Sequence, residues 1–113
     1  MGSNTEKICF CIGTSQAFEK IKDAKDLKSA FTDFLIQKSQ ITWNVFNITP
    51  HRKGGYEKCK DNMRKDMPKS ISQSILPETS LFSTRLNQEY RIIFSRENNI
   101  MMIHWISKHY GDK

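Results

Sequence analysis

Apolar residues recur along this chain with two spacings, one typical of strands and one typical of helices. Residues 7–12 read KICFCI, in which Ile8, Phe10 and Ile12 alternate with Cys9 and Cys11. Alternation of this kind predicts a short strand with small or apolar groups on both faces.

Residues 16–38 follow the helical spacing. Their apolar positions recur every three or four residues, with Lys, Asp and Glu between them: Ala17, Phe18, Ile21, Ala24, Leu27, Phe31, Phe34 and Leu35. This pattern predicts amphipathic helix, with Ser15 as the N-cap. The polar KDAKD at 22–26 offers Asp23 and Asp26 as caps, so we favour two helices in a hairpin over one long helix.

The middle of the chain gives weaker signals. Residues 41–49, ITWNVFNIT, have the β-branched and aromatic composition of a strand, although alternation fails at Val45 and Phe46, and Pro50 ends the segment. HRKGGY is expected to be a loop because of its two glycines. EKCKDNMRKDM is expected to form a short basic helix before Pro68, and the polar KSISQSILPETS is expected to be rich in turns.

The last third predicts strands joined by turns. LFSTRL alternates, NQE is a turn, and YRIIFS and IMMIHWIS flank the polar RENN. Alternation puts Tyr90, Ile92 and Phe94 on one face, and Arg91 and Ile93 on the other. In the last strand it groups Ile100, Met102, His104 and Ile106 against Met101, Ile103, Trp105 and Ser107. The predicted class is therefore α+β, with an N-terminal strand and a helical pair packed on a small antiparallel sheet.

Length and composition narrow the type of protein. A chain of 113 residues has room for one modest core, so we expect a single domain over residues 1–113. No apolar run approaches the ~20 residues of a membrane span. Three cysteines are an odd number and too few for a disulfide framework, which favours a reducing cytoplasm. Their spacing does not suit a metal site, so no metal is expected.

The net charge of +6 favours a polyanionic partner. Residues 51–69 carry seven Lys or Arg against three acidic residues. This stretch is either an RNA-binding surface, with Lys65 and Lys69 on phosphates, or a solvated surface, and composition leaves both open.

The sequence contains no Gly-rich phosphate loop, HExxH or GxSxG motif. No cofactor is expected, and an enzyme of this sequence would work with side chains alone. RNA cleavage suits such a set, because it needs a base for the 2′-OH, a cation for the phosphate and an acid for the leaving oxygen. His104, on an apolar face, is expected to be structural.

The segment SLFSTRLNQEYRIIFSRENNIMMIHWISKHY resembles the C-terminal half of the RelE-like toxins. The similarity is greatest to the YoeB-like mRNA interferase branch and is best in residues 81–110. The matching features are an aromatic-Ser-x-Arg-apolar strand, a three-residue turn, a strand that begins Tyr-Arg, and a terminal His-Tyr.

This resemblance implies a ribosome-associated mRNA endonuclease, the toxin of a type II toxin-antitoxin system, whose partners are the ribosome, mRNA and a cognate antitoxin. By position, Arg91 is similar to the arginine at the scissile phosphate, and His109 and Tyr110 to the terminal catalytic pair. Arg85 corresponds to a second basic position facing the RNA, and Lys108 is expected beside it. Where the branch has a glutamate thought to act as base, a gap-free count gives Ser72, and Glu78 and Asp66 are the nearest carboxylates.

Two other functions remain open on the same residues. One is inhibition of DNA gyrase by binding, as in the ParE-type members of the superfamily, which need no terminal His-Tyr. The other is a basic module that binds nucleic acid or protein, in which His109 and Tyr110 are a solvated tail and Arg91 forms an ion pair with Glu89 or Glu97.

Overall fold

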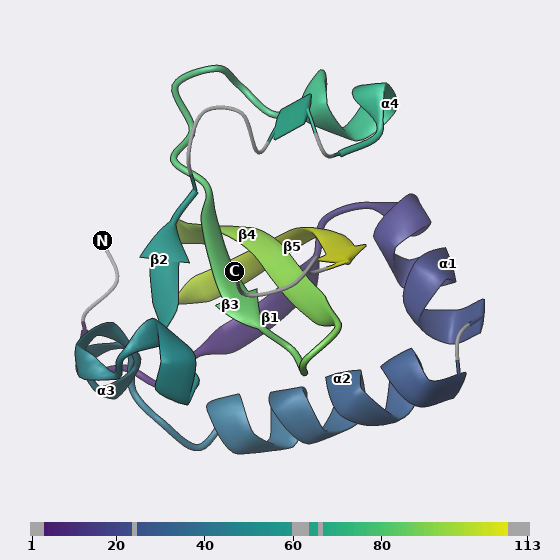
Figure 1. The fold of residues 1–113 in the computed structure, drawn as a ribbon. Coiled ribbons are helices and arrows are strands. Elements are labelled where there is room, and N and C mark those ends of the chain that lie inside the picture. Colours follow the sequence, from purple (N-terminus) through teal and green to yellow (C-terminus); the bar gives the residue numbers. More distant parts are fainter. Residues whose placement is uncertain (1–3, 24, 60–63, 66, 109–113) are drawn as a thin grey trace.

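The described part of the chain begins with a strand followed by helices and ends with a run of strands. The computed structural model describes residues 4–23, 25–59, 64–65 and 67–108 (Figure 1). The elements are β1 (Cys9–Ile12), α1 (Ser15–Asp23), α2 (Lys25–Lys38), α3 (Trp43–Ile48), the 3-10 helix η1 (His51–Lys53), β2 (Tyr56–Lys58), α4 (Lys69–Ser72), β3 (Phe82–Arg85), β4 (Tyr90–Glu97) and β5 (Ile100–Lys108).

The strands form one five-stranded sheet in the order β1-β5-β4-β3-β2. β3, β4 and β5 pair antiparallel in sequence order, as predicted, and β2 pairs antiparallel with β3. β1 joins the sheet at its edge and runs parallel to β5. A parallel pair needs a long crossover connection, which the intervening helices supply. The predicted α+β class and the predicted pair of helices are therefore confirmed.

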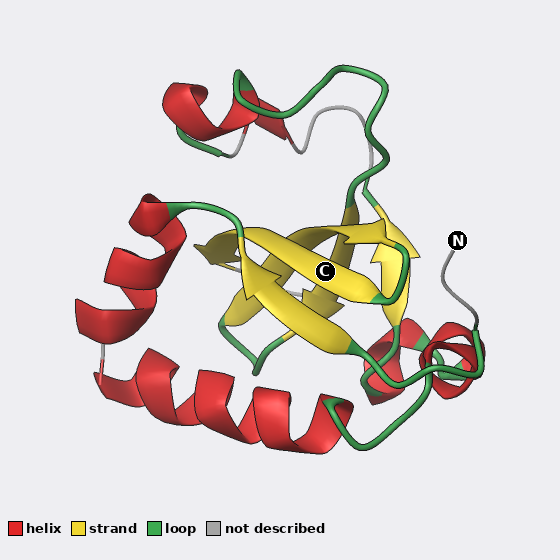
Figure 2. Cartoon of the chain, turned by 180° about the vertical axis from the view of Figure 1, so that it is seen from behind, coloured by secondary structure: helices red, strands yellow, loops and turns green. Residues whose placement is uncertain are grey.

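Apolar side chains gather on both faces of the sheet. On one face, α1, α2 and α3 pack against the strands in a main core whose buried members are Ile8, Ile21, Leu27, Phe31, Phe34, Trp43, Phe46, Ile92, Phe94, Met101, Ile103 and Ile106. A smaller second cluster comprises Met67, Ile71, Ile75, Leu81 and Ile93, with Cys59 and Trp105 packed against it. α4 and its flanking loops supply this cluster, and α4 lies on the opposite side of the sheet from α2 (Figures 1 and 2).

The predicted alternation of side chains holds along β4 and from the start of β5 up to His104, and it is reversed after that residue. Ile92 and Phe94 face the main core, and Ile93 faces the second cluster. The pairing changes register between Ile93, opposite Trp105, and Phe94, opposite Ile103, so that His104 is the extra residue of a β-bulge. Because an extra residue reverses alternation, Ile106 shares a face with Ile103, and the predicted grouping of Trp105 with Ile103 is wrong.

Residues 41–49 were expected to be a strand, and this prediction is wrong. They contain α3, which begins after Thr42, whose hydroxyl accepts a hydrogen bond from the Val45 N–H. Trp43 and Phe46, three residues apart, are both fully buried in the main core. The failed alternation at Val45 and Phe46 was the sign of this helical spacing.

The basic helix predicted over residues 57–67 is wrong at its start, because Glu57 and Lys58 lie in a strand, and residues 60–63 and 66 lie outside the described residues. Tyr56–Lys58 forms β2, the edge strand paired with β3. Gly54 precedes it in the left-handed conformation, with φ of 100°, which favours glycine. The segment expected to be rich in turns also contains the short helix α4, whose Ile71 is buried. At the start of α1, the hydroxyl that accepts the Ala17 N–H belongs to Thr14, one residue before the predicted cap Ser15.

Candidate functional site

Two arginines and a lysine lie at one end of the sheet, where β3 ends, β4 begins and β5 ends. Arg85 and Arg91 are directly opposite each other across β3 and β4. On the other side of Arg91 lies Ser107, and Lys108 is opposite Tyr90. The structure therefore places three of the residues predicted from sequence at one end of the sheet, with Arg85 and Arg91 directly adjacent.

The arginines share the face of the sheet that carries the second cluster. Ile93, two residues after Arg91, belongs to that cluster, and side chains two apart on a strand lie on the same face. Both arginines are half-buried. Lys108 is exposed, and its pairing with Tyr90 places it on the opposite face from Arg91.

Guanidinium groups bind phosphate through a planar pair of N–H donors, and two of them lie on one face where Arg85 and Arg91 are directly opposite each other. This end of the sheet can therefore hold a phosphate group.

Cys59 lies next to the arginines without being a reactive thiol. It packs against the second cluster beside Ser83. Burial raises the pKa of the Cys59 thiol to about 11, although a hydrogen bond with the Ser83 side chain and the positive charge of Arg91 act in the opposite direction. The group is protonated at neutral pH, which makes it a poor nucleophile.

Lys20, on α1, is a basic residue of this face that the sequence analysis did not single out. Its ammonium nitrogen lies 4.4 Å from the centre of the Trp105 ring. Burial lowers the pKa of Lys20 below its ordinary value. In the sequence it looked like any lysine on the polar side of an amphipathic helix, and only the position of α1 against β5 reveals it.

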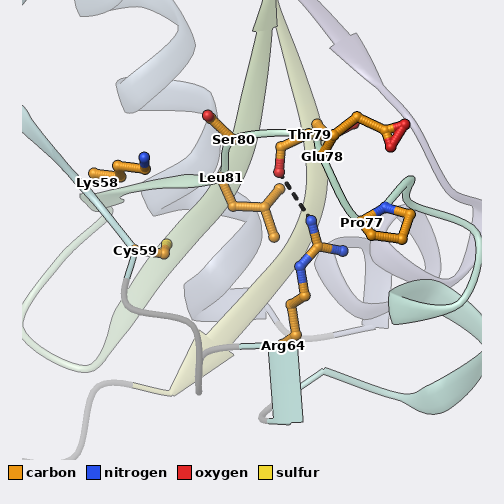
Figure 3. A pocket seen from close by; sticks show the side chains of 8 residues that line it. All are labelled: Lys58, Cys59, Arg64, Pro77, Glu78, Thr79, Ser80 and Leu81. Carbon is orange, nitrogen blue, oxygen red and sulfur yellow. Dashed lines mark hydrogen bonds between the residues drawn. The ribbon is translucent and has the colours of Figure 1, made fainter.

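The predicted RNA-binding lysines of the basic stretch lie elsewhere. Lys65 and Lys69 are exposed, near and within α4. Arg64, between the strands and α4, donates hydrogen bonds to the backbone carbonyls of Ile75, Leu76 and Thr79. Figure 3 shows its guanidinium group directed at Thr79. This arginine of the basic stretch therefore binds the chain itself.

Ser72 and Glu78, the described positions among those considered for a general base, lie in α4 and in the loop after it. Ser72 lies in α4, where its hydroxyl donates to the carbonyl of Lys69. Glu78 is exposed and lines a cavity of about 150 Å³ together with Arg64 and Cys59 (Figure 3). Asp66, His109 and Tyr110 lie outside the described residues.

His104 is structural, as predicted. Its Nε2 and the hydroxyl of Ser95 form a hydrogen bond of 2.8 Å across the bulge. Burial lowers the pKa of the imidazole, and the charge of Arg64 lowers it further. Its backbone carbonyl accepts a hydrogen bond from the Thr14 hydroxyl, which ties β5 to the start of α1.

Within residues 4–23, 25–59, 64–65 and 67–108, no group of three His, Cys, Asp or Glu side chains could hold a metal ion. In the same part of the chain, no helix combines the length and the apolar character that crossing a membrane requires.

Comparisons with known proteins give one structural likeness. No family model matches this sequence, and no curated protein matches it. A solved structure, the YoeB-YefM complex from Staphylococcus aureus, is similar, with 22% sequence identity and a TM-score of 0.47. The similarity covers 93% of this chain and 98% of that chain. A likeness of this size carries no argument about activity.

Proposed function

We propose that this protein is a metal-independent endoribonuclease that cuts mRNA on translating ribosomes, and is the toxin of a toxin-antitoxin pair. The observation that carries the proposal is the adjacency of Arg85 and Arg91 at the end of the sheet. β5, the neighbour of β4, ends there at Lys108, and the next two residues of the chain are His109 and Tyr110.

The proposed reaction begins when Arg91 binds the scissile phosphate and Arg85 binds beside it. The 2′-oxygen of the preceding ribose gives its proton to solvent and attacks the phosphorus to form a 2′,3′-cyclic phosphate, and the bond from phosphorus to the 5′-oxygen breaks. The guanidinium groups stabilise the negative charge that develops on the phosphate oxygens. His109 and Tyr110 supply the proton that the leaving 5′-oxygen takes up.

The remaining partners follow from charge and from the resemblance. Exposed Lys65 and Lys69 would contact ribosomal or messenger RNA through phosphates, giving affinity without sequence selection. An antitoxin that silences the enzyme would cover the arginines with an acidic or extended segment. Because ribosomes and mRNA are its proposed partners, we expect the protein to act in the cytoplasm.

The proposal is tested by mapping the 5′ ends of a translated mRNA in a reconstituted translation system. Wild type and His109→Ala would be compared, with no divalent metal beyond what ribosomes need. Codon-phased cuts made by the wild type and lost in the variant would support the proposal. Folded wild type that makes no cuts would overturn it, and inhibition of gyrase supercoiling would then be measured.

A further inference from the structure

Lys20 is a half-buried cation held against an aromatic ring. Its ammonium nitrogen lies 4.4 Å from the centre of the Trp105 ring. Within the part of the chain that the structure describes, no carboxylate lies within ion-pair distance of it. Lys22, on the same helix, differs because it is exposed and pairs with Glu19 at 3.3 Å.

The position of Lys20 relates it to the proposed phosphate site. Trp105 is opposite Ile93, and Arg91 is opposite Ser107, so Trp105 and Arg91 are diagonal neighbours on β4 and β5. Diagonal neighbours on one face are about 7–8 Å apart, within reach of long side chains. Trp105 and Arg91 share the face that carries the second cluster.

Burial disfavours the charged form of Lys20, and its pKa is lowered for that reason. A lysine that only covered an apolar surface would keep its charged end in water. Lys20 instead places its ammonium over the indole, on the side of the sheet where Arg91 lies. An anion bound there would stabilise both cations.

We propose that Lys20, positioned by Trp105, binds an RNA phosphate next to the one held by Arg91. This inference rests on the proposed function for the identity of the polyanion. Lys20 thereby extends the site from the end of the sheet onto α1, so that a single strand of RNA crosses β4 and β5 toward that helix. The contact is to phosphate, so it adds affinity for any sequence.

The test is the salt dependence of binding to a fluorescein-labelled single-stranded RNA carrying 2′-O-methyl groups, which cannot be cut. Binding would be followed by fluorescence anisotropy for wild type, Lys20→Gln and Lys20→Arg. Removal of one phosphate contact should reduce the slope of log K against log salt by about 0.7. Lys20→Arg should restore most of the slope, because arginine keeps the charge and also stacks on aromatic faces.

Lys22→Gln is the matched control, since it changes net charge equally from the same helix. The inference would be overturned if Lys20→Gln had the same salt slope as wild type, or if Lys20→Gln and Lys22→Gln reduced the slope equally. It would also be overturned if wild type did not bind the RNA. Thermal melting curves show whether each variant is folded. If Lys20→Gln is misfolded, comparison of Lys20→Arg with wild type still tests the site. If wild type cleaves mRNA in translation but Lys20→Gln has an unchanged salt slope, this inference alone is wrong. If the slope is reduced but wild type does not cleave, the proposed function alone is wrong.

Discussion

Arg91 sits in an otherwise apolar stretch of β4, where an arginine needs a partner or a use. If it binds the scissile phosphate, Arg91→Ala should reduce the rate of mRNA cleavage by about 100-fold or more. Arg91→Lys keeps the charge but loses the planar pair of donors, so its cleavage rate should lie between those of wild type and Arg91→Ala. Single-turnover cleavage on stalled ribosomes measures this, with Lys22→Gln as control. Wild-type cleavage by Arg91→Ala would remove Arg91 from the mechanism.

His104 gives the fold a pH dependence of defined sign. Burial first, and Arg64 second, lower its pKa in the folded chain below the ordinary 6.5. The unfolded chain therefore binds a proton that the folded chain does not, and stability is lost as pH falls through that value toward the folded pKa. From about pH 7.5 to about pH 5.5, the melting temperature of wild type should fall more than that of His104→Gln. Parallel curves would contradict this.

At the residue scale, the sequence predicted side chains whose position depends only on local alternation. Arg85 and Arg91 are adjacent because two short strands and a tight turn determine their register. Lys20 could not be predicted this way, because its contact with Trp105 joins residues from α1 and β5 that are far apart in the chain. The full burial of Ser83 and Thr84 could not be predicted either, since it depends on neighbouring strands.

α3 is the element in which tertiary packing overrides composition. Residues 41–49 have strand composition, yet a helix lets Trp43 and Phe46 enter the same core, which an alternating strand would not. The Trp43 indole N–H also donates to the carbonyl of Asn99 at 2.9 Å, which fixes the turn between β4 and β5.

Trp43→Ala should therefore destabilise the whole fold. The ring is fully buried, with the Phe46 and Phe94 rings 5.7 and 6.4 Å away between centres. The loss should be about 3–5 kcal/mol in the free energy of unfolding, measured by urea denaturation. Asn44→Ala, at the exposed next position of the helix, should lose little. A loss below about 1 kcal/mol for Trp43→Ala would contradict the assignment of this residue to the core.

The segment around α4 depends on Arg64 as well as on its own apolar cluster. Arg64→Ala removes the hydrogen bonds to three backbone carbonyls, at a cost of about 1–3 kcal/mol. Since the main core is untouched, cleavage by a protease should become faster between Leu76 and Leu81 than elsewhere. Lys65→Ala, which changes an exposed neighbour, should leave that pattern as in wild type. Uniform acceleration along the chain would mean that Arg64 supports the fold as a whole.

At the scale of the whole molecule, two faces of one sheet serve different purposes. The main core, with side chains from α1 to α3, lies on one face. The other face holds a smaller cluster, with Arg85 and Arg91 beside it, and Lys20 of α1 reaches Trp105 there. The α+β class, the first strand, the helical pair and the last three strands could be predicted from hydrophobic spacing. The bulge at His104 could not, because a register shift depends on the partner strand.

Cleavage through the 2′-hydroxyl of mRNA can be tested by one substitution in the RNA. After the cut is mapped, that mRNA is remade with a 2′-deoxy nucleotide on the 5′ side of the cut, or with the same change one nucleotide further on. The first substitution should abolish the cut, because no 2′-oxygen is present to attack, and the second should leave it. An unchanged cut in the first RNA would show that the 2′-hydroxyl takes no part in the cleavage.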